Sequence, residues 1–245
     1  MDRPDFLDRG GGRRLALRRR GGRGPALVFL PGYMSDMDGS KATALDSWAA
    51  AQGRAMLRFD YGGCGLSGGE FEAQTLGDWR DDALAAIDSV GGPVVLVGSS
   101  MGGWLMLLAA LARPDRVRGL VGVAAAPDFT DWGFDGAQKA AIRAHGRLEE
   151  PSPYGGSPYV TTRAFWESGE ALKLLGGEIA IDCPVRLLHG LADADVPWRI
   201  SLRLMERLRS GDVQATLIKD GDHRLSRDGD LARLIATLAA LLETL

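Results

Sequence analysis

The sequence contains few of the residues that build a disulfide framework or a metal cluster. Its 245 residues include only two cysteines and three histidines. Cys64 and Cys183 lie far apart and have no metal-type spacing, so the sequence predicts neither a disulfide scaffold nor a zinc site. Thiols of this kind suit a reducing compartment, and we therefore expect a cytoplasmic protein.

Long apolar runs and a strong charge of one sign are missing as well. No apolar run reaches the roughly 18 residues that a membrane span requires, and the N-terminus has no secretory apolar segment. The formal net charge of -3 gives no general attraction to nucleic acid or to an anionic membrane. We expect neither nucleic acid among the partners nor integral membrane association.

Arginine is concentrated in one short segment. Six arginines and no acid lie between Arg13 and Arg23. Such a run can form a basic arm or remain from a targeting peptide, but several aspartates precede it, whereas targeting peptides lack acids. We favour a solvated edge strand or hairpin made of Leu15–Leu17 and Ala26–Leu30, in which the charges discourage edge pairing.

The rest of the sequence indicates one α/β domain spanning residues 1–245. A chain of this length can bury a large core without dividing. Short apolar runs alternate with stretches whose apolar residues recur every three or four positions, which predicts a mostly parallel sheet covered by helices. The expected strands are Ala26–Leu30, Ala55–Phe59, Val94–Val97, Val117–Val123, Val185–His189 and Ala215–Ile218. The expected helices are Lys41–Gln52, Leu76–Val90, Trp104–Arg113, Arg199–Arg209 and Asp230–Leu242.

One pentapeptide matches a turn that exposes a nucleophilic serine. In Gly-x-Ser-x-Gly, small flanking residues let the chain bend tightly between a strand and a helix. Gly98–Gly102 fits the pattern around Ser100, and Gly65–Gly69 fits it equally well around Ser67. Only the first follows a buried strand, Val94–Val97, and precedes a helical stretch. We therefore predict that Ser100 is the nucleophile and that Ser67 is a loop residue.

A serine nucleophile needs a base, which is nearly always histidine. On this type of sheet the chain order is serine, then an acid, then histidine. His145 lies in a stretch without clear strands, and His189 ends a strand before any suitable acid, which favours a structural role. His223 follows the last expected strand in a glycine-containing loop. The sequence predicts His223 as the base.

The acid is expected on the loop after the strand Val185–His189, where it can orient the imidazole. Asp193 and Asp195 both qualify. We favour Asp193, because it stands at the usual place in His-Gly-x-x-Asp-x-x-Val-Pro. Asp195 and Asp222 are then expected to cap a turn or to face solvent.

Acyl transfer also requires donors for the oxyanion that forms in the transition state. One is the backbone N–H after the nucleophile, here Met101, and the other comes from the loop after an early strand. The segment Leu30–Tyr33 provides that loop, and we expect the Tyr33 N–H to be the second donor. The Tyr33 ring either lines the pocket or supports the turn. No metal or organic cofactor is expected.

The strand and helix pattern stops between about residues 127 and 182, where prolines and glycines recur and no strand is clear. An insertion of this kind in an α/β domain is usually a lid or cap. Its aromatic residues either cover an acyl pocket or bury the cap against the body. They are Trp132, Phe134, Tyr154, Tyr159, Phe165 and Trp166.

The likeness to one known family runs through most of the chain. It rests on the segments FLPGYMSDMDGSKA, RFDYGGCGLSGGEF, TLGDWRDD, LVGSSMGGWLMLLAALARP, CPVRLLHGLADADVPW and GDHRLS. These segments resemble the abhydrolase-domain palmitoyl-protein thioesterases, also described as acyl-glucuronide esterases. Trp104 after GSSMGG and Pro197-Trp198 after the acid are more specific than the general hydrolase pattern.

The resemblance implies an α/β-hydrolase fold with Ser100, Asp193 and His223 as the catalytic residues. It also implies hydrolysis of a thioester or ester through an acyl-enzyme intermediate. The substrate is then an acylated protein or a small molecule. A general carboxylesterase or a perhydrolase acting on small esters is the alternative enzyme, and a non-catalytic binding protein that keeps the fold is a further alternative.

Overall fold

The computed structural model describes residues 4–151 and 158–245. Within these residues one sheet has eight strands in the order β1-β2-β4-β3-β5-β6-β9-β10. The strands are β1 Asp5–Asp8, β2 Arg14–Arg20, β3 Arg23–Leu30, β4 Arg54–Phe59, β5 Val94–Ser99, β6 Val117–Val123, β9 Val185–Gly190 and β10 Val213–Ile218. The pairings of β1 with β2 and of β2 with β4 are antiparallel, and the others are parallel.

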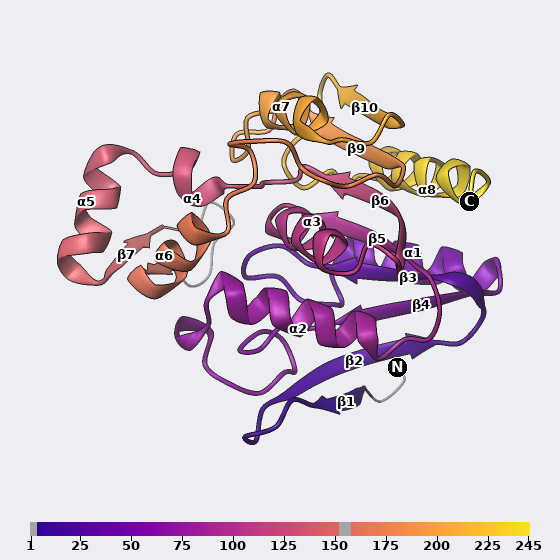
Figure 1. Ribbon diagram of the computed structural model, residues 1–245, viewed down its shortest axis with the longest axis horizontal. Coiled ribbons are helices and arrows are strands. Elements are labelled where there is room, and N and C mark those ends of the chain that lie inside the picture. Colours follow the sequence, from indigo (N-terminus) through magenta and orange to yellow (C-terminus); the bar gives the residue numbers. More distant parts are fainter. Residues whose placement is uncertain (1–3, 152–157) are drawn as a thin grey trace.

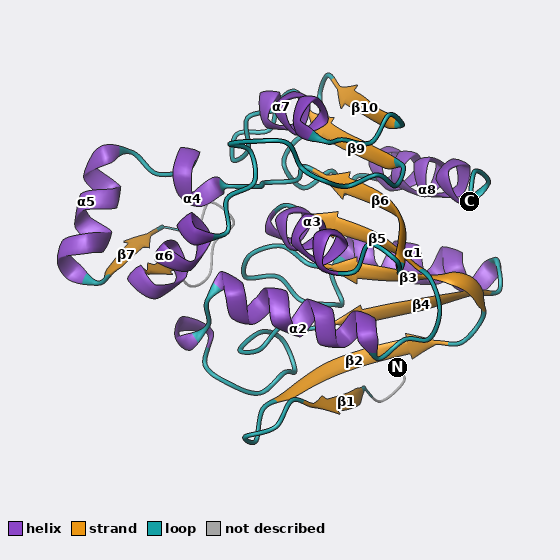
Figure 2. Ribbon diagram, viewed as in Figure 1, coloured by secondary structure: helices purple, strands orange, loops and turns teal. Residues whose placement is uncertain are grey.

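Helices cover both faces of this sheet (Figures 1 and 2). The helices of the body are α1 Ser40–Ala51, α2 Leu76–Asp88, α3 Met101–Ala112, α7 Arg199–Arg207 and α8 Asp228–Leu242. The short 3-10 helix η1, Phe71–Ala73, precedes α2. The prediction of a mostly parallel sheet between two helical layers is confirmed, and each predicted strand overlaps a strand of the structure.

The side chains of the central strands point alternately to the two faces of the sheet, so the core consists of two clusters, one on each face. Successive side chains of a strand point to opposite faces, so both faces of a buried parallel strand must be apolar. In β5, Val95 and Val97 pack in a cluster with residues of α1 and α8, whereas Val94 and Leu96 pack with residues of α2, α3 and α7. The sheet is therefore fixed from both sides, and its loops start from a rigid edge.

The expected hairpin of Leu15–Leu17 with Ala26–Leu30 is wrong. Leu15–Leu17 lies in β2 and Ala26–Leu30 in β3, but β4 lies between these two strands. All residues of Ala26–Leu30 are buried, as an interior strand with helices on both faces requires. Nor is β2 an edge, because β1 pairs with its outer side.

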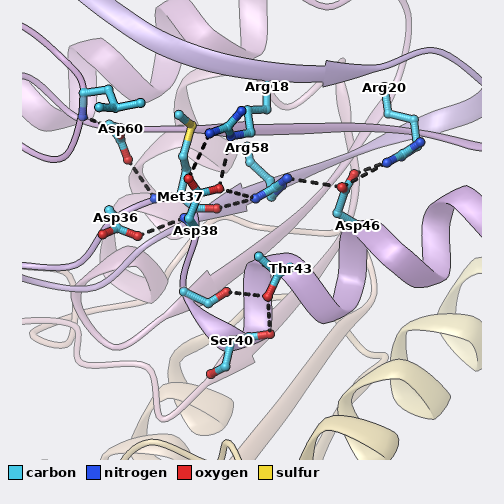
Figure 3. A network of polar contacts seen from close by, with 12 residues as sticks. Arg18, Arg20, Asp36, Met37, Asp38, Ser40, Thr43, Asp46, Arg58 and Asp60 are labelled. Atoms are coloured by element: carbon cyan, nitrogen blue, oxygen red, sulfur yellow. Dashed lines mark hydrogen bonds and ion pairs between the residues drawn. The ribbon is translucent and has the colours of Figure 1, made fainter. Parts of the chain in front are cut away.

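The arginine-rich segment is paired within the body. In β2, the Arg18 guanidinium lies 3.1 Å from the Asp38 carboxylate, and that of Arg20 lies 2.9 Å from the carboxylate of Asp46 in α1. Arg58 of β4, which is almost buried, contacts both aspartates at 2.8 and 3.2 Å. Figure 3 shows this network, which connects α1 and the loop before it to the sheet. These arginines are thus part of the fold rather than a free basic arm.

The segment between β6 and β9, which we call the cap, lies beyond the carboxyl ends of the parallel strands (Figure 1). It contains the helices α4 Phe129–Trp132, α5 Gly136–His145 and α6 Arg163–Ala171, and the antiparallel pair β7 Arg147–Glu150 and β8 Tyr159–Thr162. No strand was clear here from the sequence, because two four-residue strands are too short to show a pattern. Tyr154 lies outside the described residues. No helix in the described part of the chain is long and apolar enough to cross a membrane.

Candidate active site

Ser100 occupies a strained turn between β5 and α3. Its φ of 55° and ψ of -122° lie in a region that residues other than glycine rarely adopt. The surrounding backbone holds this conformation, since the Ser100 amide donates to the Val123 carbonyl at 2.9 Å. The Ser100 carbonyl accepts from the amides of Gly103 and Ala126 at 2.8 and 3.0 Å. This is the strand-turn-helix setting expected for an exposed nucleophile.

The two outer glycines of the pentapeptide are required by close backbone approach. A Cβ atom on Gly98 would lie 2.4 Å from the Gly102 carbonyl oxygen, and one on Gly102 would lie 2.1 Å from the Leu30 carbonyl oxygen. Neither distance is compatible with a side chain. The small residues of the motif therefore let α3 start directly against β3 and β5.

Ser67, which matches the same pentapeptide, lies in a loop. Its hydroxyl accepts from the Ala16 amide at 2.8 Å and donates to the Asp60 carbonyl at 2.7 Å. These bonds fix the loop to β2 and to Asp60, the residue after β4. Ser67 is thus placed as a structural loop residue, as expected.

The structure brings Ser100, His223 and Asp193 together. His223 Nε2 lies 3.1 Å from Ser100 Oγ, and His223 Nδ1 lies 2.9 Å from Asp193 Oδ2. The three residues come from loops that follow β5, β10 and β9, which end at the same edge of the sheet. The His223 side chain is 17% exposed, which leaves this end of the group open to solvent.

Asp193 is the buried end of the group, and its carboxylate has four donors. Oδ1 accepts from the amides of Asp195 and Val196 at 2.9 and 2.8 Å. Oδ2 faces two imidazole rings, His223 at 2.9 Å and His189 at 3.2 Å. Burial alone would raise the pKa of Asp193, but hydrogen bonds from His189 and His223 hold it well below the ordinary value. Asp193 is therefore ionised at neutral pH.

The neighbouring acids make other contacts. The alternative acid, Asp195, is exposed, and its amide donates to Asp193. Asp222 Oδ1 accepts from the Leu225 amide at 2.9 Å and so caps the turn after His223. The structure thus places Asp193, not Asp195, against His223.

The two expected oxyanion donors flank Ser100. Met101 begins α3, so its N–H has no acceptor within the helix. Gly32 places the other loop beside Ser100, because a Cβ on Gly32 would lie 3.3 Å from the Ser100 Cβ. Among the described residues, neither the Tyr33 nor the Met101 amide donates to a backbone carbonyl. Their role as oxyanion donors stays a prediction.

The Tyr33 ring connects the loop after β3 to the cap. Its hydroxyl donates to the Val160 carbonyl in β8 at 2.5 Å. The ring packs against Phe165 of α6 and against Trp79 of α2, with centroid distances of 5.2 and 5.8 Å. Burial raises the pKa of Tyr33 above its ordinary value. The ring is thus a support for the loop and the cap.

The two large aromatic residues of α6 are buried, Phe165 against Trp79 of the body and Trp166 among residues of the cap. Phe165 and Trp166 are buried, and the Trp166 indole donates to the Thr130 carbonyl at 2.9 Å. A cavity of about 580 Å³ lies between η1 and the cap strands, and Met34 and Phe71 are among its lining residues. For Phe165 and Trp166, these contacts favour the packing role over the pocket role.

One group of possible metal ligands is found within the described residues. Ligand atoms of Asp193, Asp195 and His223 lie within 4.8 Å of one another. In that group, Asp193 and His223 are joined by a hydrogen bond of 2.9 Å, which a bound cation would have to replace. We assign no metal to these residues.

His189 is the residue of the site that sequence reasoning missed. It lies one residue before the end of β9 and is fully buried, as a structural histidine would be, yet it contacts the same carboxylate oxygen as His223. The spacing of His and Asp in His-Gly-x-x-Asp was the available signal. A turn of that length can bring the first residue back to the fifth.

Comparisons with known proteins agree with this architecture. Residues 25–150 match the model of a hydrolase family described as serine aminopeptidase, S33. The chain is 41% identical over 250 aligned residues to palmitoyl-protein thioesterase ABHD10, mitochondrial, of Homo sapiens, covering 100% of this chain and 80% of that protein. For the same protein of Mus musculus, identity is 41% over 245 residues, with 98% and 82% covered.

Solved structures give the same result. Alpha/beta hydrolase domain-containing protein 10 from mouse superimposes with a TM-score of 0.93 at 40% identity, covering 99% of both chains. A putative hydrolase from Agrobacterium vitis S4 superimposes with a TM-score of 0.90 at 38% identity, covering 98% of this chain and 97% of that one.

Proposed function

This chain belongs to the family of α/β hydrolases that includes palmitoyl-protein thioesterase ABHD10, and we propose that it is a serine hydrolase that cleaves thioester or ester bonds of acyl substrates. The observation that carries the proposal is the continuous hydrogen-bonded series from Ser100 through His223 to Asp193. Membership of the family makes the chain a hydrolase. The nucleophile and the bond that it attacks are our proposal.

In the proposed reaction, His223 Nε2 takes the proton of Ser100 Oγ as that oxygen attacks the acyl carbonyl carbon. The carbonyl oxygen becomes an oxyanion that accepts from the Tyr33 and Met101 amides. His223 then gives its proton to the leaving thiol or alcohol, and the acyl group remains on Ser100. Asp193 stabilises the imidazolium that exists between these two proton transfers.

Water completes the proposed cycle. His223 removes a proton from a water molecule, which attacks the acyl-enzyme, and the same proton returns to Ser100 Oγ as the acid leaves. Nucleophile, base and oxyanion donors are all supplied by the chain, so this route requires no metal or organic cofactor.

For the substrate, we propose an acylated protein or a small acyl ester or thioester with an apolar acyl group. The support is the family, whose members quoted above are named palmitoyl-protein thioesterases. Those relatives are also named mitochondrial, and the names do not support the cytoplasmic location expected from the sequence. That location stays a prediction.

A second candidate is a general carboxylesterase or perhydrolase on small esters. It is favoured by one observation, namely that Phe165 is buried against the body and Trp166 within the cap, instead of lining an open acyl pocket. A short acyl group would need less space under the cap than a long one.

Labelling with a fluorophosphonate probe tests the nucleophile. We expect the wild type to be labelled and Ser100→Ala to lose both labelling and activity, with kcat reduced on the order of 10⁴-fold or more. Ser67→Ala is the matched control, since it removes the serine of the second pentapeptide, and it should be labelled like the wild type. An unlabelled wild type, or a labelled Ser100→Ala, would refute the proposal.

A series of p-nitrophenyl esters from acetate to palmitate, together with palmitoyl-CoA, then separates the two candidates. The thioesterase proposal predicts that kcat/KM rises with acyl length and that sulfur leaving groups are accepted. Higher kcat/KM for acetate than for octanoate or longer chains would favour the small-ester candidate instead.

A further inference from the structure

A second histidine, which the proposed reaction does not use, contacts the triad acid. His189 lies in β9 and is 0% exposed. Its Nε2 lies 3.0 Å from the Val196 carbonyl oxygen and 3.2 Å from Asp193 Oδ2. Its Nδ1 lies 2.7 Å from the hydroxyl of Ser201, a buried residue of α7. Both ring nitrogens are therefore engaged inside the protein.

The partners of His189 determine which nitrogen carries the proton. A carbonyl oxygen and an ionised carboxylate only accept hydrogen bonds, so Nε2 must be protonated. In the neutral ring Nδ1 then accepts, and the Ser201 hydroxyl is its donor. Ser201 thus fixes the tautomer in which His189 presents an N–H to Asp193.

We propose that His189, held by Ser201, is a positioning residue for the acid of the triad. This inference rests on the proposed function, because it assigns His189 a role in the reaction of Ser100. The Nε2–H of His189, which also faces the Val196 carbonyl oxygen at 3.0 Å, and the Nδ1–H of His223 both face Asp193 Oδ2, while two loop amides hold Oδ1. His189 is the one of these four donors that comes from the sheet itself.

Two effects follow when the His189 contact is lost. The carboxylate keeps three donors instead of four, so its orientation toward His223 is less restricted and kcat falls. The negative charge of Oδ2 also acts on His223 alone, which favours the imidazolium form of His223. The fall of kcat/KM at acid pH, its acid limb, therefore moves to higher pH. A histidine that merely fills space in the core would produce neither effect.

Other charged groups surround these residues and remain unchanged in the variants below. On the segments that carry the contacts of His189 and His223, they are Asp195 on the loop of Asp193, Asp220, Asp222 and Arg224 on the loop of His223, Lys41 of α1, which donates to the Arg224 carbonyl, and Arg199 and Arg203 on α7 with Ser201. Burial lowers the pKa of Lys41 to about 8, so it titrates on the alkaline side of the profile. A shift of the acid limb between variants therefore reports the contact of His189.

Steady-state kinetics with a short p-nitrophenyl ester, followed from acid to alkaline pH, test the proposal. His189→Leu removes the contacts with Asp193, Val196 and Ser201 and is expected to lower kcat by about 10- to 100-fold, as loss of a residue that supports a ligand does at metal sites. KM should change by less than about two-fold, and the acid limb should move to higher pH. His189→Gln places an amide N–H near the position of Nε2 and should restore most of kcat.

The matched control is His145→Leu, which removes an exposed histidine at the end of α5 and should behave like the wild type. Ser201→Ala removes only the donor to Nδ1, and we expect a several-fold lower kcat with the acid limb shifted in the same direction. Circular dichroism and thermal melting verify that each variant is folded.

The proposal is overturned if folded His189→Leu keeps the wild-type kcat and acid limb, or if His189→Gln is no better than His189→Leu. If His189→Leu does not fold, Ser201→Ala decides, and an unchanged kcat and acid limb in that variant overturn the proposal. Failure of the proposed function is seen separately, because the wild type would then not react with the fluorophosphonate.

Discussion

At the scale of single residues, backbone strain is concentrated around the candidate site. Five described residues other than glycine have a positive φ, and they are Met34, Ser100, Ala124, Asp128 and Leu225. Each lies in a loop that follows a strand of the parallel sheet, on the edge where Ser100, Asp193 and His223 meet. Such conformations cost about 1–3 kcal/mol each and persist where the surrounding structure enforces them. Their distribution supports the placement of the site at this edge.

Tyr33→Phe distinguishes the role of the Tyr33 backbone amide from that of its hydroxyl. The proposed oxyanion donor is the amide, so we expect kcat for short esters to stay within about two-fold of the wild type. Loss of the bond to the Val160 carbonyl should lower the free energy of unfolding by about 1 kcal/mol. For a chain of this length that corresponds to a decrease of about 2–4 °C in Tm. Steady-state kinetics and a thermal melt provide both numbers.

Tyr33→Ala is the companion variant, because it also removes the aromatic contacts with the cap and should lower Tm further. If Tyr33→Phe instead lost about 100-fold in kcat while Tm was unchanged, the hydroxyl would act on the substrate directly. The assignment of the backbone amide as the donor would then be wrong.

At the scale of elements, the ion pairs of Figure 3 hold α1 against β2 and β4. Burial alone would raise the pKa of Asp46, but Arg20 and Arg58 hold it below the ordinary value. The resulting stabilisation is complete above the ordinary aspartate pKa and is lost as pH falls through the lowered one. Asp46→Asn should therefore lower the free energy of unfolding by about 1 kcal/mol at neutral pH and by less below about pH 4.

Urea unfolding at neutral and at acid pH measures the effect of Asp46→Asn. Asp182→Asn is the control, because its ion pair with Arg209 is exposed at both ends and should contribute nothing measurable. A difference between wild type and Asp46→Asn that is equal at both pH values would show that the charge of Asp46 is not the source of the stabilisation.

The sequence predicts the strands and helices that are buried, because burial requires a recognisable pattern of apolar residues. The central strands, such as Val94–Ser99, are buried on both faces and so appear as continuous apolar runs. The edge strand Asp5–Asp8 and the cap strands have four residues each, which is too few for a period to appear. The position of β4 between β2 and β3 depends on how the chain crosses the sheet, and local composition contains no information about it.

For the candidate site as well, the sequence predicts some features and not others. Ser100, Asp193 and His223 could be placed because each follows a strand, and parallel strands end at a common edge. The contact of His189 with Asp193 was not predicted, because the His-Gly-x-x-Asp spacing only permits it. It also depends on the turn through residues 190–193 and on Ser201 from a helix. For the oxyanion loop, the sequence indicated the backbone of Tyr33 and left the role of its ring open.

At the scale of the whole molecule, the cap and the body share one set of aromatic contacts. Phe165 of the cap packs on Trp79 of the body at 5.4 Å, and Phe129 packs on Trp104 at 5.7 Å. The Trp104 indole also donates to the Leu172 carbonyl at 3.2 Å, just after α6. Separating the cap would expose these rings, so its stability depends on the body.

We therefore propose one domain, with the cap as an insertion at about residues 127–182, and predict that both parts unfold together. Hydrogen exchange should give α6 and α3 equal free energies of opening, and calorimetric and van't Hoff enthalpies should agree. Phe165→Ala removes the ring that contacts both Tyr33 and Trp79 and should make α6 exchange faster than α3. If α6 already opens at lower free energy in the wild type, the aromatic contacts do not couple the two parts. The cap would then be a separately moving lid, and long acyl chains could enter by its opening instead of through a permanent pocket.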